Sequence, residues 1–115
     1  MVTDCIFCKM VEGEINPDIV YETDRVLAFR DINPQAKVHI LVIPKKHIAT
    51  MDDFPSDQPD LAAELFLAVK RVAQQEGLDG KGYRTVINCL EDGGQEVFHL
   101  HLHVLGGRKL TWPPG

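Results

Sequence analysis

The segment FHLHLHV at residues 98–104 decides how the rest of this chain is interpreted. Histidine stands at every second position, and on a β-strand that period of two puts all three imidazoles on one face. Neighbouring histidines would then lie roughly 6.6 Å apart. Groups that titrate near neutral pH, held in a row on a rigid support, suit proton transfer, nucleophilic attack or metal ligation. The residues between them would face the core: Phe98, Leu100, Leu102 and Val104.

The histidine row has a simpler interpretation, as a metal site or a chance surface run. Three histidines in strict alternation, opposite a wholly apolar face, nevertheless indicate a functional site, because tuned imidazoles gather at such sites. His39 lies in an apolar segment, where it is either a hydrogen-bonded core histidine or a donor into the same site. Asn88, taken alone, is typical of a turn or a sheet end. The Gly93-Gly94-Gln95 run suits a hairpin turn, or a backbone that a phosphate can approach.

Composition limits the class of protein. The chain has 115 residues, 44% of them apolar and 25% charged, which fits one globular domain over residues 1–115. Its net charge of −5 argues against a protein that binds nucleic acid. No apolar run is long enough to span a bilayer, and Met1–Cys5 does not resemble a signal peptide. We therefore expect a cytoplasmic protein that does not bind membranes.

Hydrophobic periodicity predicts an α+β fold with a mainly antiparallel, five-stranded sheet, one long helix and one short helix. The long helix is expected over Pro59–Gly77, with Asp57 as its cap and an apolar stripe facing the core. The short helix is expected over Ile6–Val11. Val38–Ile43 reads as a central strand buried on both faces and ended by Pro44. The other expected strands are Ile19–Glu22, Arg25–Arg30, Tyr83–Cys89 and Val97–Leu105.

Cys5 and Cys8 form a Cys-x-x-Cys pair, which is half of a tetrahedral zinc site. A complete site needs two more ligands, and His47 and His99 are the candidates. Four protein ligands would close the site, so such a zinc would be structural. The alternative is that both cysteines are small apolar residues of the short helix. A redox role is less favoured because no βαβ pattern surrounds the pair. Cys89 is expected to be buried and inert.

The chain resembles the histidine triad (HIT) superfamily, whose signature of alternating histidines and apolar residues matches HLHLHVL at residues 99–105. The Fhit branch, which cleaves dinucleoside polyphosphates, usually has Gln shortly after the third histidine; Val104 and Leu105 stand there in this chain and favour the Hint branch. The resemblance implies a HIT-like fold and a homodimer that joins two sheets into one of ten strands. The segments that carry it are CIF at 5–7, FRDINPQA at 29–36, HILVIPKKH at 39–47, GGQEV at 93–97, LGGR at 105–108 and WPPG at 112–115.

The Hint branch contains purine nucleotide-binding phosphoramidate hydrolases, so the resemblance implies an adenosine 5′-phosphoramidase that binds AMP. His101 would attack the α-phosphorus and form a nucleotidyl-histidine intermediate, which water hydrolyses. Because the attacking imidazole must be neutral, its other nitrogen should donate to a backbone carbonyl. His103 and His39 would donate to the non-bridging phosphate oxygens. Asn88 and Gln95 would position phosphate and sugar.

The resemblance also assigns the nucleotide pocket. Asp31 would accept hydrogen bonds from the ribose hydroxyls, although a loop aspartate also commonly caps a turn. Gly94 would let the phosphate approach the backbone. Trp112 would lie near the partner subunit's active site. An apolar slot for the purine would consist of residues that are otherwise ordinary core residues: Phe7, Ile15, Phe29 and Ile32.

Zinc-bearing members of the superfamily use a Cys-x-x-Cys pair, a histidine after a Pro-Lys-Lys-like loop and the first triad histidine, which implies zinc here. Glu96 stands near the position where animal Hint proteins often have a serine that helps to protonate the leaving group; a glutamate there either acts as a general acid or faces solvent. Three other functions remain open. They are a nucleotide-binding interaction module with incidental catalysis, a dinucleoside polyphosphate hydrolase or nucleotidyl transferase of the same superfamily, and a purely metal-binding protein.

Overall fold

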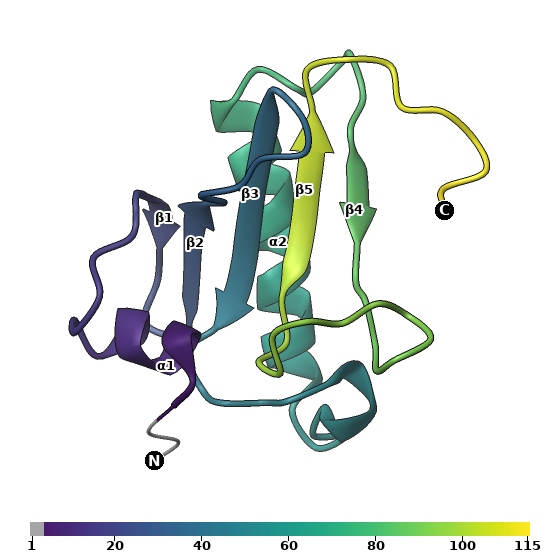
Figure 1. Ribbon diagram of the computed structural model, residues 1–115. Coiled ribbons are helices and arrows are strands. Elements are labelled where there is room, and N and C mark those ends of the chain that lie inside the picture. Colours follow the sequence, from purple (N-terminus) through teal and green to yellow (C-terminus); the bar gives the residue numbers. More distant parts are fainter. Residues whose placement is uncertain (1–3) are drawn as a thin grey trace.

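The computed structural model describes residues 4–115, in which one antiparallel sheet of five strands carries an α-helix on each face (Figure 1). The strand order is β1-β2-β3-β5-β4, and all neighbouring strands are antiparallel. The predicted α+β fold is confirmed. The elements are α1 Ile6–Val11, β1 Ile19–Glu22, β2 Val26–Arg30, β3 Val38–Pro44, a 3-10 turn Met51–Asp53, α2 Pro59–Gln75, β4 Arg84–Val86 and β5 Leu102–Gly106.

Strand β3 is central and buried on both faces, as its continuous apolar run predicts. Ile40 and Val42 pack against the helix α2 side of the sheet, whereas Leu41 and Ile43 pack with Phe7 of α1 on the opposite side. This alternation follows from the period of two along a strand. It divides the interior into two apolar clusters, and the histidines of β3 and β5 lie on the α1 side because they occupy the alternate positions.

Helix α2 covers one face of the sheet through the predicted apolar stripe. Gly77 follows its end with a φ of +71°, a conformation that glycine adopts without a Cβ penalty. Asp57 is not the cap, because the N-cap is Gln58, whose side chain makes no capping hydrogen bond. The buried residues of the stripe are Leu61, Leu65, Ala68, Val69, Val72 and Ala73.

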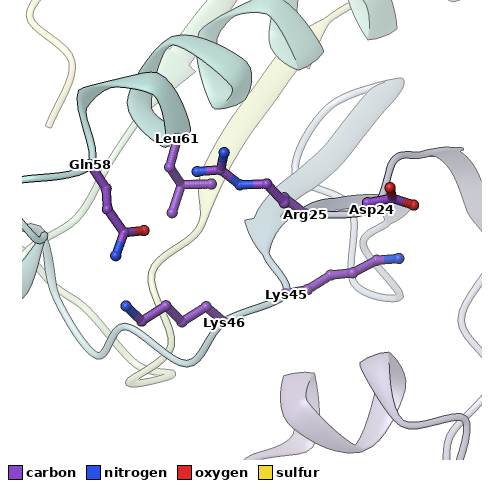
Figure 2. A pocket seen from close by; sticks show the side chains of 6 residues that line it. All are labelled: Asp24, Arg25, Lys45, Lys46, Gln58 and Leu61. Carbon is purple, nitrogen blue, oxygen red and sulfur yellow. The ribbon is translucent and has the colours of Figure 1, made fainter.

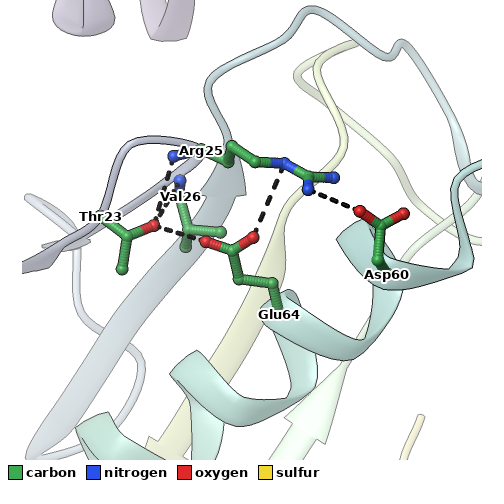
Figure 3. A network of polar contacts seen from close by, with 5 residues as sticks. All are labelled: Thr23, Arg25, Val26, Asp60 and Glu64. Carbon is green, nitrogen blue, oxygen red and sulfur yellow. Dashed lines mark hydrogen bonds and ion pairs between the residues drawn. The ribbon is translucent and has the colours of Figure 1, made fainter.

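The β1–β2 turn is tied to the first turns of α2 by a polar network (Figure 3). The Thr23 hydroxyl donates to Glu64 Oε1 at 2.8 Å and accepts the Val26 backbone N–H at 3.1 Å. The Arg25 guanidinium donates to Asp60 at 2.7 Å and lies 3.6 Å from Glu64. The Thr23 hydroxyl therefore stabilises the turn and also anchors the turn to helix α2.

The histidine strand is shorter than expected: β5 spans Leu102–Gly106, not Val97–Leu105. The register pairs Val42 with Leu102, so Pro44 faces the position of Leu100. Proline has no N–H to donate to a ladder, and strand pairing stops there. The chain bends over residues 97–99, and the Leu100 N–H donates to the Ile48 carbonyl instead. The prediction that Phe98 faces the core is wrong, because it is 48% exposed.

Other boundaries differ from expectation as well: β2 begins at Val26 and not at Arg25, and α2 ends at Gln75 and not at Gly77. Strand β4 covers Arg84–Val86 and not Tyr83–Cys89, and β3 includes Pro44 as its last residue. No helix in the described chain combines the length and apolar character needed to cross a membrane. The segment Met1–Cys5 is expected not to be a signal peptide. Its first three residues, 1–3, lie outside the described residues.

Candidate active site and metal centre

Two histidines from neighbouring strands meet on the sheet face opposite α2. His39 on β3 and His103 on β5 are diagonal neighbours across the antiparallel pair. His39 is paired with Leu105, and His103 is paired with Leu41. Their side chains bring His39 Nε2 within 2.9 Å of His103 Nδ1. Adjacent central strands are rigid supports, so the two imidazoles are held in one geometry.

The hydrogen bonds around this pair fix which nitrogen of each ring carries its proton. The backbone N–H of Gln35 donates to His39 Nδ1 at 3.0 Å, so the proton of a neutral His39 is on Nε2. Nε2–H in turn donates to His103 Nδ1, which places the His103 proton on Nε2. That Nε2 is buried and has no hydrogen-bond partner within residues 4–115. It is therefore a donor that no group within residues 4–115 uses.

Burial keeps both imidazoles neutral. Desolvation lowers the pKa of His103 to about 4, and the nearby His101 and His39 act in the same direction. Desolvation also lowers the pKa of His39, although the Asp31 carboxylate, 3.4 Å from Nε2, opposes this. A neutral imidazole donates through one nitrogen only. The direction of hydrogen bonding along the pair therefore persists at neutral pH.

His101 has the geometry that a nucleophilic imidazole requires. Its Nδ1 lies 2.8 Å from the backbone carbonyl oxygen of His99, so the proton sits on Nδ1 and the lone pair of Nε2 is left for attack. This is the predicted bond to a backbone carbonyl. The Phe7 ring packs edge-on against the imidazole, with centroids 5.3 Å apart, and the His103 ring lies 4.9 Å away. Nucleophile and donor thus stand side by side.

The predicted metal ligands also come together. His99 Nδ1 lies 3.3 Å from Cys5 Sγ, 3.6 Å from Cys8 Sγ and 3.2 Å from His47 Nδ1, and Cys8 Sγ lies 3.3 Å from His47 Nδ1. All four ligand atoms are within 4.8 Å of one another. A tetrahedral zinc site with ordinary bond lengths has edges of about 3.5 Å between S and N and about 3.3 Å between two nitrogens. The donor set therefore fits a tetrahedral ion.

Surrounding groups favour metal ligation by His99 and, without a cation, oppose ionisation of Cys8. His99 Nε2–H donates to the Pro44 carbonyl at 2.8 Å, which turns the Nδ1 lone pair toward the thiols. Burial lowers the pKa of His99 to about 4 and so keeps it neutral, the form that ligates metals. Burial, and then the Cys5 thiol beside it, raise the pKa of Cys8 to about 11. A bound cation would reverse that effect by stabilising the thiolate.

The predicted purine slot is only partly assembled in this chain. Phe7 and Phe29 are buried with ring centroids 5.4 Å apart, and Phe7 also touches His101. Ile15 is 38% exposed and Ile32 is 97% exposed, so neither belongs to an enclosed slot. The Phe7 ring therefore adjoins His101, Phe29 packs against Phe7, and the isoleucines lie at the surface.

The predicted phosphate and ribose contacts have several structural roles. Asp31 Oδ1 accepts the Asn33 N–H at 2.9 Å in a local turn, while Oδ2 faces His39. Gln95 is buried, and its side chain accepts from the Leu90 N–H and donates to the Ala49 and Val97 carbonyls. It thereby holds the loop before the histidines. Asn88 is half-buried just after β4, and Gly94 is exposed with a φ of +77°.

Trp112 is 80% exposed in the C-terminal tail, which leaves the sheet beyond β5 (Figure 1). The Arg84 guanidinium donates to the Thr111 carbonyl at 2.9 Å and so holds the start of this tail near β4. The structure does not bring Trp112 to the histidines of its own chain. Its large exposed ring is free to contact another molecule.

A hollow of about 300 Å³ near the start of α2 carries basic side chains but no histidine (Figure 2). Two of its three cations are paired with carboxylates, Lys45 with Glu22 at 2.6 Å and Arg25 with Asp60 at 2.7 Å. It offers no catalytic group and is not the candidate site. Its lining residues are Asp24, Arg25, Lys45, Lys46, Gln58 and Leu61.

Two contributions to the site were not predicted from the sequence, and both come from backbone groups. The Gln35 N–H sets the tautomer of His39, and the Pro44 carbonyl orients His99. Backbone groups leave no mark in residue type, so nothing in the sequence pointed to Gln35. Pro44 could be predicted as a strand end, but not as a hydrogen-bond acceptor.

Comparison with known proteins agrees with this geometry. The HIT domain family model matches residues 12–110. The chain belongs to the HIT family. An uncharacterized HIT-like protein of Synechococcus elongatus is 56% identical over 115 residues, and the match covers 100% of this chain and 100% of that protein.

Two HIT structures are similar to this one. A HIT family hydrolase from Legionella pneumophila has a TM-score of 0.95 and 54% identity, covering 97% of this chain and 100% of that one. A histidine triad nucleotide-binding protein from Candida albicans has a TM-score of 0.83 and 32% identity, covering 96% and 83% respectively. The HIT domain match begins after Cys5 and Cys8, so the case for a metal centre depends on the four ligands themselves.

Proposed function

We propose that this HIT protein is a Hint-type hydrolase of purine nucleoside 5′-phosphoramidates, with adenosine 5′-phosphoramidates as its type substrates. The observation that carries the proposal is the bond from His101 Nδ1–H to the His99 carbonyl, which leaves Nε2 as a nucleophile. The neighbouring His103 supplies a buried donor for phosphate oxygens. A similar Candida albicans structure is described as a histidine triad nucleotide-binding protein, which supports nucleotide as the ligand.

The first step is attack of His101 Nε2 on the α-phosphorus. The P–N bond breaks, the amine leaves, and a nucleotidyl-histidine forms whose imidazolium charge is stabilised by the His99 carbonyl. Negative charge grows on the non-bridging oxygens, where His103 Nε2–H would donate. His39 would act mainly through His103, since its Nε2–H already points to that ring.

The second step is hydrolysis, in which water attacks the phosphorus, AMP is released and His101 is restored. The proton left over from water goes to solvent. The amine that departs in the first step needs a proton of its own, and Glu96 is the proposed donor because it stands close in sequence before the histidines. Its side chain is exposed, so it can exchange protons with solvent.

Nucleotide placement follows from the surrounding residues. The Phe7 and Phe29 rings would contact the base, with Ile15 and Ile32 closing over it from the surface. Asp31 would accept from the ribose hydroxyls. The remaining residues proposed to contact phosphate and sugar are Asn88, Gly94 and Gln95.

Zinc is the proposed ion for the centre formed by Cys5, Cys8, His47 and His99, since two thiols and two imidazoles are the ligands it prefers. With four protein ligands the centre would be structural, and zinc, when bound, would hold the two thiolates and two imidazoles together. His99 would then be committed to the metal, which leaves His101 and His103 to serve the phosphate.

We further propose a homodimer in which two sheets join into one of ten strands, with Trp112 reaching toward the partner subunit's site. Strand β4 is an edge strand in this chain, and an exposed edge readily pairs with a second copy. The exposed Trp112 ring would gain an apolar contact in such an assembly.

The test is steady-state hydrolysis of an adenosine 5′-phosphoramidate with a reporter amine, comparing wild type with His101→Ala. We expect turnover by wild type and a loss of at least about 10³-fold in kcat for the variant, since it lacks the nucleophile. AMP binding by calorimetry should be largely retained. A dinucleoside polyphosphate is assayed alongside, to test whether the protein prefers the substrates of the Fhit branch. A folded wild type that binds AMP without turning over any substrate would overturn the enzyme proposal in favour of a binding module.

A further inference from the structure

One short segment of the chain touches both the metal centre and the proposed nucleophile. Cys5 and Cys8 place their thiols within 3.3 Å and 3.6 Å of His99 Nδ1. Between them, Phe7 presents its ring to His101, with centroids 5.3 Å apart, and to His99 at 5.8 Å. Any shift of this segment relative to the sheet therefore moves a ring that packs against the proposed nucleophile.

A second connection runs through His99 itself. Its Nδ1 belongs to the metal cluster, its Nε2–H donates to the Pro44 carbonyl, and its own carbonyl accepts the His101 Nδ1–H at 2.8 Å. His99 lies in a bend outside the strand ladder, so sheet hydrogen bonds do not hold its backbone. The peptide group of that carbonyl is held from two sides: the Leu100 N–H donates to the carbonyl of Ile48, next to the ligand His47, and the His99 side chain is fixed by the metal cluster and Pro44.

No other hydrogen bond to the His101 ring exists in the described part of the chain, so the His99 carbonyl alone selects its tautomer. An imidazole without such a partner places its proton on either nitrogen. A proton on Nε2 would remove the lone pair that attacks phosphorus. The position of one carbonyl oxygen therefore decides what fraction of the protein can react.

We propose that a metal ion held by Cys5, Cys8, His47 and His99 positions His101, through the His99 carbonyl and the Phe7 ring. His99 and Phe7 are positioning residues in this scheme. The role of His101 as nucleophile rests on the proposed function, but its tautomer can be measured without turnover. The metal centre thereby sets catalytic competence in addition to stabilising the fold.

Two of the four ligands line a hollow at the surface of the folded protein. A surface pocket of about 440 Å³ is lined by Cys5 and His47, so a chelator or zinc ion can reach two of the ligands from solvent. The pocket also has Asp4 and Glu96 in its lining, and carboxylates attract cations.

The chain offers a matched pair of variants. Cys5 is the N-cap of α1, where its Sγ accepts the Cys8 N–H at 3.3 Å. Serine is among the best N-cap residues, so Cys5→Ser keeps the cap while removing a thiolate ligand. Cys89→Ser makes the same chemical change outside the cluster and serves as the control.

The experiment measures the ¹⁵N and ¹H resonances of the His101 ring by long-range correlation NMR. Full-length wild type loaded with zinc ion, the same protein after chelation, Cys5→Ser and Cys89→Ser are compared. Zinc content, backbone amide spectra and thermal unfolding are recorded on the same samples. If Cys5→Ser does not fold, the comparison of zinc-loaded with chelated wild type tests the proposal by itself.

We expect a pure Nδ1–H pattern in zinc-loaded wild type and in Cys89→Ser. In chelated wild type and Cys5→Ser the two nitrogens should move toward averaged shifts while the amide spectrum stays folded. If the enzyme turns over, kcat should fall about 10- to 100-fold on chelation, with a smaller change in KM, and recover when zinc is restored.

Three results would overturn the inference. The first is an unchanged Nδ1–H pattern after zinc is removed, and the second is wild type that takes up no zinc. The third is collapse of the whole amide spectrum on chelation, because the metal would then act on the fold at large. Failure of the proposed function looks different: the tautomer changes with zinc, but no phosphoramidate is hydrolysed in either form.

Discussion

His103 accepts at its Nδ1 the hydrogen bond that His39 donates from Nε2, over a distance of 2.9 Å. The bond has one direction because the Gln35 N–H occupies the other nitrogen of His39. Protonation of His103 would place a second proton on Nδ1, facing the His39 donor. This arrangement therefore works only while both rings are neutral, which makes it sensitive to acid.

Acid should destabilise the fold through this pair. The pKa of His103 is lowered from 6.5 to about 4 by burial, so the unfolded chain binds more protons than the native protein between these values. The contribution of neutral His103 to the free energy of unfolding is fully present above pH 6.5 and is lost as the pH falls toward 4. Urea unfolding of wild type and His103→Gln at several pH values measures it. The variant should show a shallower fall in unfolding free energy over this window, and equal slopes would contradict the assignment.

The donor role of His103 can be separated from its bulk. His103→Leu fills the space without an N–H, whereas His103→Gln carries an N–H near the position of Nε2. We expect kcat for phosphoramidate hydrolysis to fall about 10²–10³-fold in the leucine variant, the usual effect of losing one oxyanion donor. The glutamine variant should keep more activity than the leucine variant. Equal losses would show that shape, and not donation, is what the site needs.

The loop before the histidines should not tolerate a side chain at Gly93. A Cβ there would lie 2.5 Å from the Cys89 carbonyl oxygen and 2.7 Å from its nitrogen, and backbone cannot rotate away as a side chain can. Gly93→Ala should cost at least about 2 kcal/mol of unfolding free energy. Gly80→Ala is the control, since no atom lies within 4 Å and only its φ of +82° opposes alanine, at about 1 kcal/mol.

Hydrogen exchange gives a second measurement of the same loop. The Leu90 N–H donates to Gln95 Oε1 and should exchange faster in Gly93→Ala, because the loop must open to admit the methyl group. Gly80→Ala should leave that amide unchanged. Similar exchange in both variants would mean that the loop absorbs the methyl group without moving Gln95.

Arg30 and Glu76 join the end of β2 to the end of α2 through two hydrogen bonds of 2.8 Å and 2.9 Å. A double-mutant cycle with Arg30→Met and Glu76→Gln isolates their coupling, and Met keeps much of the apolar stem. We expect about 0.5–1 kcal/mol at low salt, because Arg30 is 42% exposed and solvent screens the pair. The coupling should shrink in 1 M salt. Additive effects would show that the pair is energetically neutral.

The sequence predicts the elements that are defined by a long apolar pattern. Val38–Ile43 is apolar at nearly every position and forms the central strand, and the stripe from Leu61 to Val72 faces the sheet. In both cases burial of apolar area determines the structure, and apolar residues can be recognised from sequence alone. The metal ligands were predicted from residue type and spacing, and the structure brings all four together.

Features set by a distant backbone group could not be predicted in this way. Strand β5 begins late because Pro44, which is 58 positions before Leu102, faces the chain where pairing would continue. The tautomer of His39 depends on the Gln35 N–H, which every residue except proline would supply. Asp57 has the chemistry of a cap, but the helix starts one residue too late for it to serve. Local propensity could not determine any of these features.

The unpartnered Nε2–H of His103 makes folding and ligand binding depend on the same atom. Pairing a buried donor with an acceptor is worth about 1–3 kcal/mol, so a phosphate oxygen bound at this nitrogen would stabilise the fold as it binds. Mutations that stabilise the ligand-free protein by removing this donor would then weaken its affinity for anions. For this chain, selection for greater thermal resistance and selection for tighter nucleotide binding would oppose each other at one nitrogen.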